Sequence, residues 1–307
     1  MNKTAFIFPG QGAQYLGMGM DFYQSFPEAK EVIELAGRAA GLDLVKLISE
    51  EEEKLNVTEY TQIAMLAVET AIWKVLDGKG MQADVTAGLS LGEYGALAVS
   101  GVMTLEDLFK VIRKRGIYMQ EAYPVGGAMT AVLGAEASLV EAVCEETEGI
   151  VSIANYNCPG QIVITGEEKA VKEAAGKLAE QGVKRCIPLK VSGPFHSELL
   201  KEAGKKLRME LNQAEVSAPQ IPYLSNVNAD YVTEKDGIRD LLEQQVASPV
   251  RFWQSIEKMI ADGVDCFVEI GPGKTLNGFI RKISKDVQVY NVDKVADLEK
   301  VMEVFSC

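Results

Sequence analysis

Ser90 stands in a pattern that could make it a nucleophile. The stretch 88–92 reads GLSLG, and its surroundings predict a strand at 84–89 followed by a helix at 91–99. Glycines at this spacing allow a tight turn that lifts the serine hydroxyl from the backbone, beside helix N–H groups that can bind an oxyanion. The alternative is a Gly-rich turn with a capping serine, but the strand–turn–helix context favours a nucleophile.

His196 is the only histidine in the chain, so any imidazole base must be this residue. It lies in a Gly-Pro loop at a predicted junction between two structural units, where functional residues often gather. A surface or capping histidine is the alternative. Between Ser90 and His196 the only aspartate is Asp107, at a predicted helix start. A Ser-His-Asp hydrolase is therefore poorly supported, and another group, such as a backbone carbonyl, must orient the imidazole.

Arg115 falls inside the apolar stripe of a helix predicted to begin at Thr104. The stripe consists of Leu108, Val111, Ile112, Tyr118, Met119 and Ala122. A buried guanidinium without a partner is costly, so Arg115 needs an anionic partner. One alternative is an internal salt bridge, or a side chain whose guanidinium reaches solvent. The other is a substrate carboxylate held in a bidentate fork.

Two glycine-rich stretches resemble nucleotide loops only weakly. The stretch 9–12, PGQG, lacks the third glycine of the dinucleotide pattern, and Val268 stands where a phosphate loop ending at Thr275 needs its first glycine. A nucleotide-binding module is the least favoured function class. Gln11 is instead a candidate amide donor to an oxyanion.

Composition excludes several further classes. A net charge of −13 disfavours a nucleic-acid binder. The five cysteines form no CxxC pair, which predicts reduced thiols in a cytoplasmic protein. No signal peptide, no membrane span and no metal-ligand spacing is expected. The sequence thus predicts a cytoplasmic protein without metal, membrane or nucleic-acid partners.

The elements that must position these residues alternate along the chain. Strands are predicted at 4–8, 84–89, 266–270 and 287–292, and helices at 61–76, 91–99, 249–261 and 276–283, which indicates an α/β fold with a mostly parallel sheet. The middle differs, with strands at 128–133, 150–155, 161–165 and 184–189 and helices at 136–147 and 167–181. This βαββαβ order is ferredoxin-like. We expect a subdomain at 126–190 inserted into a larger unit of 1–125 and 191–307.

Seven stretches together resemble one family. They are FPGQGAQ (8–14), GLSLGEYGAL (88–97), RKRGIYMQEA (113–122), NCPGQIVITG (157–166), VSGPFHS (191–197), QVASPVRFW (245–253) and EIGPGKTL (269–276). In this set and order they look like the malonyl-CoA:acyl carrier protein transacylase family, almost end to end. The resemblance implies an α/β-hydrolase-like subdomain with a ferredoxin-like insert. It also implies malonyl-CoA and acyl carrier protein as partners, no bound cofactor beyond the coenzyme A thioester substrate, and a monomer.

The resemblance also implies roles for individual residues. Ser90 would be the acylated nucleophile, His196 its base, and Arg115 the group that binds the malonyl carboxylate. The remaining implied residues are Gln11 and the Leu91 N–H as oxyanion hole, the Gln245 carbonyl that orients the histidine, Asn157 in a loop facing the cleft, and Phe195 of the malonyl-type pattern.

One departure from the family pattern is Leu89, which stands where the family usually has a histidine before the nucleophile. A polyketide-synthase acyltransferase and a serine thioesterase remain alternative functions. The carrier protein is acidic, so a basic docking patch is also expected. Its candidates are Lys190, Lys201, Lys205, Arg281 and Lys282.

Overall fold

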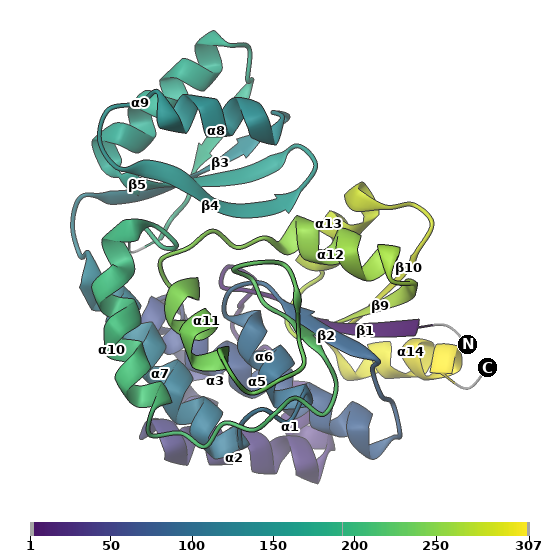
Figure 1. Ribbon diagram of the computed structural model, residues 1–307. Helices are drawn as coiled ribbons and strands as arrows, with labels where there is room; N and C mark the ends of the chain where they lie inside the picture. The colour runs from purple at the N-terminus through teal and green to yellow at the C-terminus, as the bar shows by residue number, and fades with distance from the viewer. Residues whose placement is uncertain (1–2, 192, 306–307) are drawn as a thin grey trace.

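A six-stranded sheet runs through the larger part of the molecule (Figure 1). The structure, a computed structural model, describes residues 3–191 and 193–305, so Ser192 and Cys307 lie outside the described residues. The strand order is β10 (Gln288–Val292), β9 (Val264–Ile270), β1 (Lys3–Phe8), β2 (Val85–Gly88), β7 (Tyr223–Leu224), β8 (Tyr231–Val232). All neighbours pair in parallel except β7 and β8. The predicted α/β fold with a mostly parallel sheet is confirmed.

Alternation along β1 explains how the sheet is covered on both faces. Phe6 and Phe8 enter one buried core with the helices α2 (Pro27–Ala40), α5 (Thr58–Gly78) and α7 (Leu105–Ala122). Ala5 and Ile7 enter a second core with α12 (Phe252–Ala261) and α13 (Thr275–Ile283). Successive strand side chains point to opposite faces, so an uninterrupted apolar run such as this one is buried on both.

The remaining helices of the larger part include the buried α6 (Gly92–Val99), and the others lie around it. These helices are α1 (Met20–Ser25), α3 (Leu44–Glu50), α4 (Glu52–Leu55), α6, α10 (Lys201–Leu211), α11 (Ile238–Gln245) and α14 (Leu298–Phe305), with short 3₁₀ turns at Glu198–Leu200 and Val295–Asp297. The start of α7 is as predicted, because the Thr104 hydroxyl accepts the Asp107 backbone N–H at 3.2 Å.

A smaller unit lies beside this body, at the top of Figure 1. Its elements are β3 (Gly127–Leu133), α8 (Ala137–Glu145), β4 (Val151–Cys158), β5 (Gln161–Glu167), α9 (Glu168–Glu180) and β6 (Arg185–Pro188). The strands form an antiparallel sheet in the order β4-β5-β3-β6. The βαββαβ element order predicted from the sequence is therefore present.

Two predicted boundaries are wrong for the same physical reason, which is strand pairing. Asn157 lies in β4 rather than in a loop, because β4 pairs with β5 as far as Cys158↔Gln161. The helix predicted at 249–261 begins only at Phe252, because Val250 forms a parallel bridge with Asn155. Hydrogen bonds between distant segments extend the strand and shorten the helix beyond what local pattern indicates.

Candidate active site

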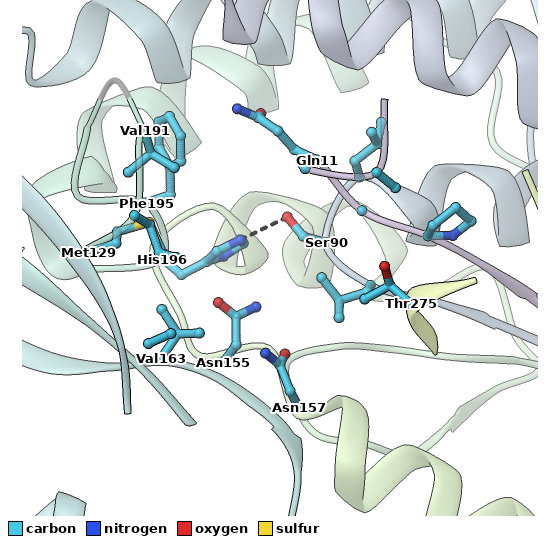
Figure 2. Close-up of a pocket in the computed structure, with 18 of the residues that line it drawn as sticks. Gln11, Ser90, Met129, Asn155, Asn157, Val163, Val191, Phe195, His196 and Thr275 are labelled. Atoms are coloured by element: carbon cyan, nitrogen blue, oxygen red, sulfur yellow. Dashed lines mark hydrogen bonds between the residues drawn. The ribbon is translucent and has the colours of Figure 1, made fainter. Parts of the chain in front are cut away.

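Ser90 occupies a strained turn between β2 and α6. Its φ is 55°, in the left-handed region that non-glycine residues rarely adopt. A Cβ on Gly88 would overlap the main chain of Gly92, and one on Gly92 would overlap the main chain of Phe8. The two glycines therefore allow the close approach of β1, β2 and α6 that the turn requires. The predicted elbow is present, with its hydroxyl facing a cavity (Figure 2).

His196 contacts Ser90 directly, although the two lie 106 positions apart in the sequence. The distance from Ser90 Oγ to His196 Nε2 is 2.7 Å (Figure 2). On the other side of the ring, Nδ1 lies 2.8 Å from the backbone carbonyl of Gln245. A carbonyl can only accept, so Nδ1 carries the proton and Nε2 is left to accept from the serine.

The protonation state of His196 suits a base. Burial, helped by the charge of Arg115, lowers its pKa to about 4. The imidazole is therefore neutral at neutral pH and able to take a proton. The Gln245 carbonyl acts in the opposite direction, because it favours the protonated ring. Orientation by a carbonyl also explains why no aspartate was found at the expected place in the sequence.

Arg115 is 1% exposed and reaches the same serine. One guanidinium nitrogen, Nη2, donates to Ser90 Oγ and to Gln245 Oε1, each at 3.0 Å. The other, Nη1, donates to Gln62 Oε1 at 2.6 Å. These partners are uncharged oxygens, so the contacts do not match the internal ion pair considered from the sequence. Its Nε is buried with no hydrogen-bond partner among the described residues.

A cavity of about 310 Å³ lies between the two units at this point. Residues of the larger body and of the smaller sheet line it together, with Met129, Asn155, Asn157 and Val163 on the side of the smaller sheet (Figure 2). The predicted residues on its wall are Gln11, Ser90, Leu91, Arg115, Asn157, Phe195 and His196. Gln245 lies behind the wall, where its carbonyl holds the histidine.

The two candidate oxyanion donors differ in what their side chains do. The Gln11 side-chain amide donates to Thr58 Oγ1 at 3.0 Å and points away from Ser90 (Figure 2). Its backbone N–H is thus the group that remains for an oxyanion. Leu91 directly precedes α6, where backbone N–H groups are left unpaired within a helix. Leu89 also lines the cavity, in the place where the family usually has a histidine.

Sequence reasoning missed three polar residues of the site. Gln62 on α5 accepts from Arg115. Asn226, after β7, accepts the Ser90 N–H at 2.7 Å and donates to the Gly88 carbonyl at 2.7 Å. Glu93 on α6 is fully buried. A buried acid directly after the nucleophile motif was the one available signal, because an acid inside an apolar helix needs partners.

The remaining expectations concern surface and composition. Lys201 and Lys205 pair with Glu198 and Glu202 at 3.0 and 2.6 Å, which leaves Lys190, Arg281 and Lys282 as the less neutralised of the five candidates for a docking patch. Across residues 3–191 and 193–305, no cluster of three metal-binding side chains occurs. Within the same ranges, no helix is long and apolar enough to cross a membrane.

The fold and the matched sequence define an acyltransferase. A family model described as Acyl transferase domain matches residues 5–300. Malonyl CoA-acyl carrier protein transacylase of Bacillus subtilis is 43% identical, covering 99% of this chain and 97% of that protein. The chain therefore belongs to the malonyl CoA-acyl carrier protein transacylase family.

Solved structures agree with this assignment. The crystal structure of malonyl CoA-acyl carrier protein transacylase from Clostridium perfringens is 45% identical, with a TM-score of 0.95 over 99% of this chain and 97% of that one. A malonyl-transacylase in complex with a type II PKS acyl-carrier protein is 38% identical, with a TM-score of 0.95 over 98% and 99% of the two chains.

Proposed function

We propose that the protein transfers a malonyl group from coenzyme A to the phosphopantetheine thiol of acyl carrier protein through a malonyl-Ser90 intermediate. The observation that carries this proposal is the shared serine oxygen. Ser90 Oγ lies 2.7 Å from a neutral imidazole nitrogen and 3.0 Å from a buried guanidinium. Activation of a serine nucleophile needs only the imidazole. The guanidinium beside it is explained by an acyl group that carries its own carboxylate.

In the first half-reaction His196 Nε2 takes the proton of Ser90, whose oxygen attacks the thioester carbonyl of malonyl-CoA. The oxyanion is bound by the backbone N–H groups of Gln11 and Leu91. The carbon–sulfur bond then breaks, and the coenzyme A sulfur leaves with the proton from His196. Arg115 binds the malonyl carboxylate throughout.

In the second half-reaction the carrier thiol gives its proton to His196 and attacks the malonyl ester of Ser90. The carbon–oxygen bond breaks, and the proton returns from His196 to Ser90. The two half-reactions share one base and one acyl-enzyme, so the kinetics are ping-pong. The Gln245 carbonyl orients the imidazole in both half-reactions. Asn157 and Phe195 line the space that takes the acyl group and its thiol arm.

The two units have distinct parts in this proposal. Residues 1–125 and 191–307 form an α/β-hydrolase-like catalytic subdomain, and residues 126–190 form a ferredoxin-like insert. The strand order β4-β5-β3-β6 supports the second assignment, because it places the first and third strands of a βαββαβ unit at the centre. The parallel sheet with the serine after β2 supports the first.

The setting of the reaction follows from the same proposal. The protein acts as a cytoplasmic monomer, without metal, cofactor, membrane or nucleic acid. The acidic carrier docks near Lys190, Arg281 and Lys282, all of which are exposed. Charge reversal at these three positions should slow transfer to the carrier and leave acylation by malonyl-CoA unchanged.

Intact mass spectrometry tests the proposal directly. Incubation with malonyl-CoA alone should add one malonyl group, the Ser90→Ala variant should add none, and acyl carrier protein should remove the group. An adduct that clears at the same rate in buffer would instead indicate a thioesterase. Equal removal by fatty-acid and polyketide carrier proteins would leave the polyketide-synthase alternative as a second role.

A further inference from the structure

A fully buried carboxylate, Glu93, lies behind Ser90 and takes no part in the steps above. It is in the first turn of α6 and is 0% exposed. Its Oε2 accepts from Gln245 Nε2 at 2.6 Å and from the Asn226 backbone N–H at 3.1 Å. Its other oxygen has no hydrogen-bond partner among the described residues. One carboxylate oxygen therefore joins two segments that are distant from it in sequence.

Both partners bind the main chain of Ser90, and Gln245 also binds His196 and Arg115. Gln245 orients His196 through its carbonyl and Arg115 through Oε1, at 2.8 and 3.0 Å. It also donates from Nε2 to the Ser90 carbonyl at 3.0 Å. Asn226 fixes the Ser90 turn through the N–H and carbonyl contacts described above. The reacting groups are thus all one residue removed from Glu93.

We propose that Glu93 is a positioning residue for acyl transfer, whose single oxygen Oε2 aligns Gln245 and Asn226 and thereby sets the serine, the histidine and the arginine together. The inference rests on the proposed function in that the aligned groups are the ones that react. Without Oε2, the Gln245 side chain that binds Arg115 and the Ser90 carbonyl would lose its anchor, and so would the Asn226 backbone next to the Ser90 turn. A misplacement of about 1 Å in such a site can cost about 100-fold in rate.

The hydrogen bonds, rather than the charge, are the constant contribution of Glu93. Burial raises its pKa to about 7, while the bonds from Gln245 and Asn226 and the charge of Arg115 act against that rise. Oε2 can accept both bonds whether or not the carboxyl carries a proton on its other oxygen. An amide oxygen in the same place would do the same.

Four variants distinguish the contributions of the Glu93 side-chain length, its charge and its burial. Glu93→Gln keeps an acceptor at the same reach and removes the charge. Glu93→Asp keeps the charge but is one methylene shorter, and Glu93→Ala removes both. Glu69→Ala is the matched control, because Glu69 is also fully buried in the larger body and its carboxylate oxygens have no hydrogen-bond partner among the described residues.

The measurement is the rate at which an uncharged alkyl fluorophosphonate labels Ser90, followed by intact mass, beside malonyl transfer from malonyl-CoA. Labelling reports the activated serine even if the acyl donor has been wrongly assigned, so failure of the proposed function would not hide the result. Thermal unfolding of each variant shows that labelling is measured on folded protein.

We expect Glu93→Ala and Glu93→Asp to be labelled about 10- to 100-fold more slowly than the wild type, and Glu93→Gln within about threefold of it. Glu69→Ala should be labelled at the wild-type rate. If Glu93→Ala does not fold, the Asp and Gln variants decide. Labelling of Glu93→Asp at the wild-type rate, of Glu93→Gln as slowly as Glu93→Asp, or of Glu69→Ala as slowly as either, would each overturn the inference.

Discussion

The two walls of the cavity are built differently. On the wall of the larger body, Ser90, His196 and Arg115 are held by hydrogen bonds of 2.6–3.0 Å to one another and to buried amides and carbonyls. On the wall of the smaller sheet, Met129 and Val163 are apolar, and the buried Asn157 Oδ1 has no partner among the described residues. The first wall is preorganised for one reaction, whereas the second offers contacts that a ligand can complete.

Removing Ser90 or His196 should have the largest effect on malonyl transfer. Ser90→Ala and His196→Ala should each lower malonyl transfer by about 10⁴-fold or more, because they act as one unit. The double variant should be no worse than either single variant. The measurement is single-turnover transfer to acyl carrier protein, with thermal unfolding as the control. A double variant that loses the product of the two single effects would show that the residues act independently.

Removing the buried Arg115 guanidinium should slow acylation by malonyl-CoA much more than acylation by acetyl-CoA. Arg115→Ala should lower acylation by malonyl-CoA by about 10- to 100-fold, since a hydrogen bond to a charged group contributes about 1.5–3 kcal/mol. Acylation by acetyl-CoA should change little. The measurement is the ratio of the two acylation rates, and Arg115→Lys, which keeps the charge without the fork, should recover part of the difference. Equal losses for both donors would remove the carboxylate-binding role.

The pH dependence of acylation should show how far burial in the larger body lowers the pKa of His196. Because the pKa of His196 is lowered to about 4, the base stays neutral down to about that pH. Acylation should therefore change little between pH 8 and pH 5, whereas an ordinary histidine of pKa about 6.5 would lose about 30-fold at pH 5. Rapid-quench acylation rates on folded protein check this. A fall with a midpoint near pH 6.5 would contradict the lowered pKa.

The same shift has a consequence for stability, and its sign is fixed. Between about pH 6.5 and pH 4, the unfolded chain binds a proton at His196 that the folded protein does not. The contribution of this residue to the free energy of unfolding is therefore complete above that window and is lost as pH falls through it. In urea unfolding at several pH values, the free energy of unfolding of the wild type relative to His196→Gln should fall as pH is lowered from 7 to 4.

Changes on the wall of the smaller sheet and beside the histidine should have the smallest effects on the rate of malonyl transfer. Asn157→Ala should lower that rate by only about threefold, in keeping with the loss of one neutral hydrogen bond to the ligand. Phe195→Ser should enlarge the cavity and raise methylmalonyl transfer relative to malonyl transfer. Competition between the two coenzyme A esters measures the ratio. A loss at Asn157 as large as at Arg115 would erase the distinction between the walls.

The sequence could indicate candidate site residues where residue type and local context coincide. Ser90 lies in a glycine pattern between a strand and a helix, and His196 has no competitor. Gln62, Asn226 and the contacts of Glu93 were missed because they depend on which loops meet after folding. The Ser90–Asn226 contact, for example, joins residues 136 positions apart. Likewise the end of β4 depends on its pairing with β5, which no local pattern reports.

The bridge between Asn155 and Val250 connects the larger body to the edge of the smaller sheet. Val250 donates to the Ala154 carbonyl at 2.8 Å and accepts from Tyr156 at 2.9 Å, so it is stitched into the edge of the smaller sheet. Only five residues earlier in the chain stands Gln245, whose carbonyl steers the imidazole. A tilt of the smaller unit away from the larger body would therefore pull on the short segment between Gln245 and Val250. The backbone between Gln245 and Val250 therefore connects the residue that orients the imidazole directly to the edge of the smaller sheet.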